Sequence, residues 1–141
     1  MIKKNYELLE HTADMRVKVK SKSLKDLFRD VALAMFDIMA ERNLELKSSK
    51  LKKIVIKQKA NNLEELLINW LNELLSLSAI KELIFTDLKV KRMNDNILEA
   101  EVFGEDISNY KLNTEIKAAT YHQLKIEKIN SGWQTEVIFD V

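Results

Sequence analysis

The sequence of 141 residues contains no cysteine, no proline and only two glycines, Gly104 and Gly132. The lack of cysteine excludes disulfides, zinc–thiolate sites, iron–sulfur clusters and thiol catalysis. Both common glycine-rich phosphate loops need several glycines within a short window, and two isolated glycines cannot provide them. The absences therefore exclude thiol-based chemistry and nucleotide binding through either of these loops.

The chain also lacks an excess of one charge, since its 23 lysines and arginines are nearly balanced by 22 aspartates and glutamates. A generic phosphate-backbone binder carries a basic excess, so we expect no strong direct binding to nucleic acid, although a local basic patch remains compatible. The most apolar stretch, 63–77, contains five acidic or amide side chains and cannot span a bilayer. The first four residues lead into polar sequence rather than the apolar run of a signal peptide. We expect a cytoplasmic protein without a membrane partner.

Length and composition fit one folded domain. Apolar residues make up 46% of the chain and charged residues 32%, as in ordinary globular proteins. A chain of this length can bury a substantial core. No linker or low-complexity run divides the sequence, so we expect a single domain over residues 1–141.

The first half of the chain reads as two strand–helix units. Alternation of apolar and basic residues over 15–20 predicts a half-buried strand. Ser23 is a suitable N-cap for a helix, with Asp26 three residues on and an apolar stripe after it. A strand over 51–59 follows, and a second helix begins at Asn62. This second helix is the most hydrophobic, so we expect it to pack centrally across a sheet.

The second half of the chain predicts two hairpins. Strands over 85–93 and 97–103 flank a short Asn-rich turn, and strands over 118–129 and 133–141 flank a turn that contains glycine. The fold class is therefore α+β, with two helices packed on a largely antiparallel sheet. The element order is compatible with two similar units, one inserted in the other.

The two histidines do not form a catalytic constellation in the sequence. His11 and His122 lack an evident nucleophile and orienting acid, so we expect structural roles for them and no catalytic residue. His11 begins a short segment that ends at Asp14. Threonine and aspartate in this segment fit a turn that bonds its own backbone, and Asp14 also fits a metal ligand or an anchoring carboxylate.

The end of the sequence places two acidic groups side by side. Asp140 is followed by Val141, whose α-carboxylate adds a second negative charge, and their repulsion is unfavourable without a cation or basic group nearby. Oxygen ligands of this kind suit Ca²⁺ or Mg²⁺. If Asp14 joined them, the site would hold three carboxylates. Lys117 is a further candidate for contact with a phosphate or a partner carboxylate, or is an ordinary solvated lysine.

Four landmarks then occur in order along the chain. They are His-Thr-Ala-Asp at 11–14, a Leu-Leu-x-x-Trp-Leu-x-x-Leu-Leu helix at 66–75, Lys-Ala-Ala-Thr-Tyr-His at 117–122, and Asp-Val at 140–141. Together they resemble the archease family, although the glycine usual in that family shortly after the N-terminal aspartate is missing. The resemblance implies a strand–helix–strand–strand module with a second similar module inserted.

The resemblance also implies a function. Archeases are non-catalytic accessory proteins that promote guanylylation and multiple turnover of the GTP-dependent tRNA-splicing RNA ligase. An older proposal makes them chaperones or specificity factors of a tRNA cytosine methyltransferase. The metal site of the family, seen with calcium, corresponds here to Asp14, Asp140 and Val141.

The resemblance leaves three residues as candidates for partner contact, namely His11, Lys117 and His122. Besides the ligase activator and the methyltransferase chaperone, a third hypothesis is that the protein is a small metal-dependent hydrolase that uses these carboxylates. A hydrolase would need a base beside them, and His11 is the candidate nearest in sequence.

Overall fold

The computed structural model describes residues 5–10, 14–47 and 49–141. Two α-helices occur within these residues, α1 (Leu24–Met39) and α2 (Leu63–Lys81), together with a short 3₁₀ helix, η1 (Ile107–Asn109). The strands in chain order are β1 (Tyr6–Glu10), β2 (Asp14–Ser21), β3 (Ala40–Arg42), β4 (Lys52–Lys59), β5 (Leu83–Met93), β6 (Ile97–Asp106), β7 (Tyr110–Leu112), β8 (Ala118–Thr120), β9 (Ile126–Ile129) and β10 (Gly132–Asp140).

The strands form three antiparallel sheets. The largest has the order β1-β2-β10-β8, with β9 also paired to β10. A second sheet has the order β4-β6-β5, and a small one pairs β3 with β7. The predicted antiparallel character is confirmed, but the strands divide among separate sheets.

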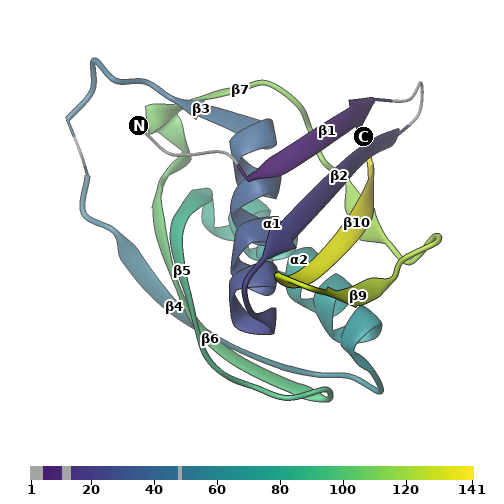
Figure 1. Cartoon of the computed structure of the whole chain (residues 1–141). Helices are drawn as coiled ribbons and strands as arrows, with labels where there is room; N and C mark the ends of the chain where they lie inside the picture. Colours follow the sequence, from purple (N-terminus) through teal and green to yellow (C-terminus); the bar gives the residue numbers. More distant parts are fainter. Residues whose placement is uncertain (1–4, 11–13, 48) are drawn as a thin grey trace.

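The helices lie between the two larger sheets (Figure 1). Helix α1 packs on β2 on one side and on β5 on the other, while α2 contacts β8 and β5. One buried cluster contains side chains from both sheets and both helices, such as Val17, Phe28, Trp70 and Val102. The indole Nε1 of Trp70 donates a 3.0 Å hydrogen bond to the carbonyl of Phe28, so the buried tryptophan also joins the two helices.

The topology contains one strand–helix–strand–strand unit inside another. The inserted unit is β4-α2-β5-β6, which closes a sheet of its own. The outer unit starts with β2 and α1 and is completed by β8, β9 and β10 after the insertion. This arrangement confirms the α+β fold class and the nested modules expected from the resemblance. None of the helices in the described residues is long and apolar enough to cross a lipid bilayer.

Both predicted helix starts are confirmed in atomic detail. Ser23 accepts a hydrogen bond from the backbone N–H of Asp26 at 3.1 Å, and Asn62 accepts one from Glu65 at 2.8 Å. Each bond satisfies a backbone donor that the first helical turn leaves unpaired.

The single strand predicted over 118–129 is wrong. The segment forms two short strands, β8 and β9, which both pair with β10 and are separated by a turn. Within this turn Leu124 donates its N–H to the carbonyl of Tyr121 at 2.9 Å, and Gln123 has a left-handed φ of 55°. A left-handed residue other than glycine has little sequence signature, so the alternation of residue types did not reveal the break.

Candidate functional site

Pairing of β2 with β10 brings Asp14 together with the C-terminal end of the chain. The antiparallel register sets Asp14 directly opposite Asp140, and Val17 opposite Val137. Both valines are fully buried. Because side chains alternate between the two faces of a strand, the two aspartates lie on the sheet face that points away from the helices. Asp14 is half-buried and Asp140 is exposed.

The other predicted site residues fall around this pair in different ways. Val141 directly follows β10 and is half-buried against the core. The backbone N–H of Lys117 donates to the carbonyl of Asp140 at 2.8 Å, which holds Lys117 beside the pair, and its side chain is exposed. His122 is exposed in the turn after β8, and His11 lies outside the described residues.

Three buried polar atoms without a hydrogen-bond partner among the described residues also gather here. They are Oδ1 of Asp14, Nε of Arg16 and Oγ1 of Thr120. Arg16 and Thr120 both face Ile138 in the register, one step along the sheet from Asp140. The Arg16 Nε lies 4.0 Å from Oδ1 of Asp14, which is too long for a hydrogen bond. Buried unsatisfied groups are costly and rare. Asp14 and Arg16 are neighbours on β2 and lie at ion-pair distance, whereas Thr120 lies on the other side of β10.

Arg16 and Thr120 were not among the residues singled out from the sequence. The alternation over 15–20 contains a usable signal for Arg16, because a residue two positions from Asp14 must share its face. Thr120 has no comparable local signal, since its position depends on the register between β8 and β10.

Asn72 of α2 holds the short strand β8 in position. Its Nδ2 donates to the carbonyl of Ala119 at 3.1 Å, and its Oδ1 accepts from the N–H of Ala119 at 2.8 Å. The two bonds satisfy the backbone N–H and carbonyl of Ala119, as a neighbouring strand would. They thereby support Lys117 and Thr120, which lie at the start and the end of the same short segment.

The donor set around the aspartate pair consists of oxygen atoms. Two side-chain carboxylates come from Asp14 and Asp140, which stand opposite each other in the register. No group of three histidine, aspartate or glutamate side chains converges within the described ranges, so side chains alone do not complete a metal site there. Like charges directly opposite each other in a sheet are destabilising, and hard divalent cations prefer such oxygens. The two opposed carboxylates therefore have the chemistry that suits a hard cation, which would need further ligands besides these two side chains.

A second acidic centre lies on the inserted module and is fully partnered. Glu105 of β6 is 5% exposed. It accepts hydrogen bonds from Nη2 of Arg42 at 2.7 Å, the hydroxyl of Tyr110 at 2.9 Å and Nδ2 of Asn109 at 3.0 Å. These donors, Arg42 first among them, hold the pKa of Glu105 at about 2 against a usual value of 4.5. Glu105 thus links β6 to β3 and β7.

Known proteins match this chain over nearly its whole length. The archease protein family matches residues 6–141. The archease of Methanosarcina barkeri is 34% identical, over 98% of this chain and 97% of its own. That of Pyrococcus furiosus is 36% identical, over 98% and 99%.

Solved structures share the same fold. Protein 1598 of Methanobacterium thermoautotrophicum superposes with a TM-score of 0.74 at 27% identity, covering 99% of this chain and 100% of that one. A Thermotoga maritima archease, described as a possible chaperone, gives a TM-score of 0.67 at 24% identity over 94% of both chains. The family match over residues 6–141 and the relatives at 34% and 36% identity show that the chain belongs to the archease family.

Proposed function

We propose that this protein is a non-catalytic accessory protein that activates a GTP-dependent tRNA-splicing RNA ligase. It would promote guanylylation of the ligase and multiple turnover in RNA joining, in the cytoplasm. The observation that supports this proposal best is the cross-strand pair of Asp14 and Asp140, with an unpartnered buried oxygen on Asp14, in a chain of the archease family.

The same pair supports a proposed cation site. Asp14, Asp140 and the backbone oxygens of Val141 would hold a divalent cation, for which Ca²⁺ is the expected ion because every donor is a hard oxygen. The bound cation would supply the positive charge that offsets the two opposed carboxylates. Arg16, which lies on the same sheet face, adds a fixed positive charge beside Asp14.

The protein would act on its partner through this acidic face. Its carboxylates would dock at the mouth of the ligase active site and help to position metal or GTP there. The exposed Lys117 side chain is held next to Asp140 by the backbone bond between the two residues, and it would contact a phosphate or carboxylate of the partner. In this scheme the bond-forming chemistry belongs to the ligase.

The second candidate function is that of a chaperone or specificity factor for a tRNA cytosine methyltransferase. It is favoured by the description of the Thermotoga maritima relative as a possible chaperone. This function predicts altered aggregation or methylation specificity of the methyltransferase, and no effect on ligase guanylylation.

The deciding experiment mixes this protein with the ligase of its own organism, labelled GTP and a divalent metal. The double variant Asp14→Asn with Asp140→Asn should lose roughly ten-fold or more of the stimulation of ligase guanylylation, as expected when the coupling between two proteins is removed. A matched control, Glu45→Gln with Asp95→Asn, removes the same charge at two exposed positions and should stay within about two-fold of the wild type.

Melting temperatures of both double variants establish that each is folded. Full stimulation by a folded Asp14→Asn and Asp140→Asn protein would contradict the proposal. A change in methyltransferase solubility or specificity in that same variant would then support the second candidate.

A further inference from the structure

One stretch of the chain is basic and free of acids. Residues 46–63 contain six lysines and neither aspartate nor glutamate, although the whole chain is nearly neutral. This stretch includes β4, which forms one edge of the three-stranded sheet. The near-neutral total therefore hides a local excess of positive charge on one side of the inserted module.

The lysines lie along the edge of the sheet at regular positions. Lys53, Lys57 and Lys59 have the same parity in β4 and share the face that points away from the helices, because Ile56 on the opposite face is buried. Residues two apart in a strand are separated by about 6–7 Å, so Lys57 and Lys59 form a row of charges along the strand.

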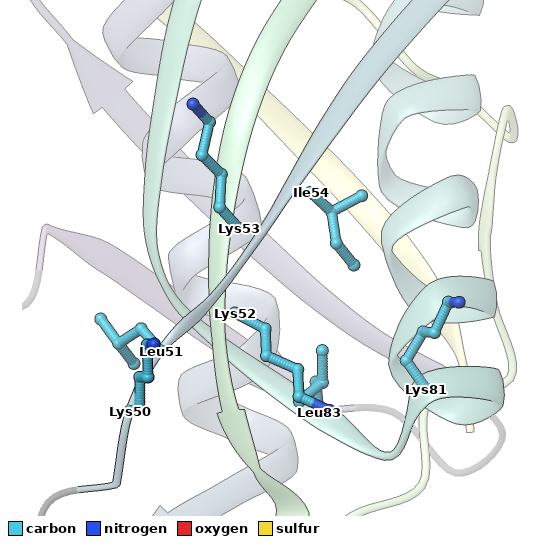
Figure 2. Close-up of a pocket in the computed structure, with 7 residues that line it drawn as sticks. All are labelled: Lys50, Leu51, Lys52, Lys53, Ile54, Lys81 and Leu83. Atoms are coloured by element: carbon cyan, nitrogen blue, oxygen red, sulfur yellow. The ribbon is translucent and has the colours of Figure 1, made fainter.

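Other lysines surround a hollow beside the start of β4. The hollow has a volume of about 540 Å³ and is lined by four lysines and by Leu51, Ile54 and Leu83, with no acidic side chain among the described residues that line it. Figure 2 shows Lys52 extending from β4 toward Leu83 on the side of the strand that faces α2, where Lys81 projects from the last turn of that helix. We call six exposed lysines around this edge the lysine strip, with three on the outward face of β4 (Lys53, Lys57 and Lys59) and three at or beside the hollow (Lys50, Lys52 and Lys81).

Most of the strip is not neutralised from within the protein. Lys53 pairs with Glu101 at 2.8 Å, and Glu101 is shared with Lys91 at 3.5 Å. The other five lysines form no ion pair within 4.0 Å in the part of the chain that the structure describes. Two of these five have an acidic neighbour at longer range, since Lys57 stands opposite Glu99 in the register and Lys52 interacts electrostatically with Asp106. The lysines still outnumber these carboxylates, and an excess of ammonium groups creates a positive potential that attracts an anionic partner.

An aromatic ring lies beside the strip. Phe103 of β6 is opposite Lys53 in the register and is half-exposed. It is absent from the apolar residues that pack on the core, which agrees with its place on the outward face of the sheet. Val55, between Lys53 and Lys57, is 58% exposed on the same face. On its other side Phe103 stands opposite Asp87 of β5, so the lysines lie along the β4 side of the ring only. A row of lysines beside an accessible ring on a sheet is suited to a single strand of nucleic acid, whose phosphates contact the amines while a base stacks on the ring.

We propose that the lysine strip and Phe103 bind single-stranded RNA through its phosphate backbone and one stacked base. The choice of RNA rests on the proposed function, because the substrate of the ligase is RNA. The strip would hold an RNA end near the ligase while the acidic face at Asp14 and Asp140 engages the enzyme.

The test is fluorescence anisotropy of a labelled oligouridine of about 12 nucleotides with the full-length protein, over a range of salt concentrations. The triple variant Lys52→Gln, Lys57→Gln, Lys59→Gln should bind roughly ten-fold or more weakly at low salt. It should also lower the slope of log affinity against log salt by about 2, since each lost phosphate contact on a single strand contributes about 0.7.

A matched triple variant carries the same charge change elsewhere. Lys20→Gln, Lys22→Gln, Lys111→Gln removes three exposed lysines outside the strip and should change the affinity by less than about two-fold. Phe103→Leu should weaken binding by roughly five-fold without altering the salt slope, because stacking does not release counterions.

Several results would overturn the inference. They are no binding by the wild type at low salt, an equal loss in the two triple variants, or displacement of RNA by polyglutamate as readily as by unlabelled RNA. A strip variant that aggregates but binds RNA normally would assign the lysines to protecting the exposed edge of β4 and would also overturn it.

The two proposals fail in different assays. Guanylylation of the ligase is measured without RNA, so the strip triple variant should stimulate it as well as the wild type does. RNA binding by the protein alone tests the strip even if the ligase is not its partner.

Discussion

Two acidic centres of this protein differ in how their charges are satisfied. Glu105 is buried and accepts hydrogen bonds from Arg42, Tyr110 and Asn109. Asp14, by contrast, stands opposite Asp140 and has a buried oxygen without a hydrogen bond from any described residue. A carboxylate whose donors all come from its own chain stabilises the fold, whereas one that lacks them retains its capacity to bind something else.

The difference between Glu105 and Asp14 follows from which elements supply the groups around each carboxylate. Around Glu105 the donors belong to β3, η1 and β7, which enclose the end of β6. Around Asp14 the opposite strand brings a second carboxylate, and Arg16 stays 4.0 Å away. The first centre should therefore matter most for stability and the second for binding.

The largest effect is expected at Glu105. Replacement of Glu105 by Gln removes the charge that Arg42 pairs with and should lower the free energy of unfolding by roughly 2–4 kcal/mol, because breaking a buried pair leaves its partner uncompensated. The melting temperature should fall by roughly 6–12 °C. Calorimetry checks this value, and calcium binding should be unaffected.

Glu101→Gln is the matched control, since Glu101 is a charged residue of the same strand but pairs with exposed lysines. Its melting temperature should change by no more than about 2 °C. Equal losses in the two variants would contradict the contrast between a buried and an exposed pair.

The second effect is the pH dependence of the same centre. The pKa of Glu105 is lowered from 4.5 to about 2 in the folded protein, so its stabilising contribution is complete above about pH 4.5 and is lost as the pH falls toward 2. The difference in unfolding free energy between the wild type and Glu105→Gln should shrink over this range. Urea unfolding at several pH values measures it, and a difference independent of pH would contradict the role of Arg42.

The smallest effect on stability is expected at Asp14. Asp14→Asn removes one of two opposed like charges, so without divalent ions the protein should be unchanged or more stable by up to about 1 kcal/mol. The wild type should be stabilised by saturating Ca²⁺, by about 2.7 kcal/mol at a concentration 100 times the Kd, and the variant should not. Equal stabilisation of both by Ca²⁺ would argue against Asp14 as a ligand.

Local sequence signals predicted much of the fold. The caps at Ser23 and Asn62 and the hairpin of β5 with β6 formed as expected, because each depends on residues close together in the chain. The break between β8 and β9 was missed, since it depends on a left-handed Gln123 that has no distinctive neighbour pattern. The division of the strands into separate sheets also has no local cause, because it depends on which face each helix covers.

In the candidate site, too, some features follow from local sequence and others only from the tertiary structure. By itself the sequence determined the acidic character of Asp14 and Asp140, the alternation that puts each on one face of its strand, and the family landmarks around them. Only the tertiary structure decided that these two residues stand opposite each other, with Arg16 and Thr120 beside them. Alternation is a property of one strand, but register is set between strands distant in the chain, and it takes the packing of α1 and α2 between the sheets to select it.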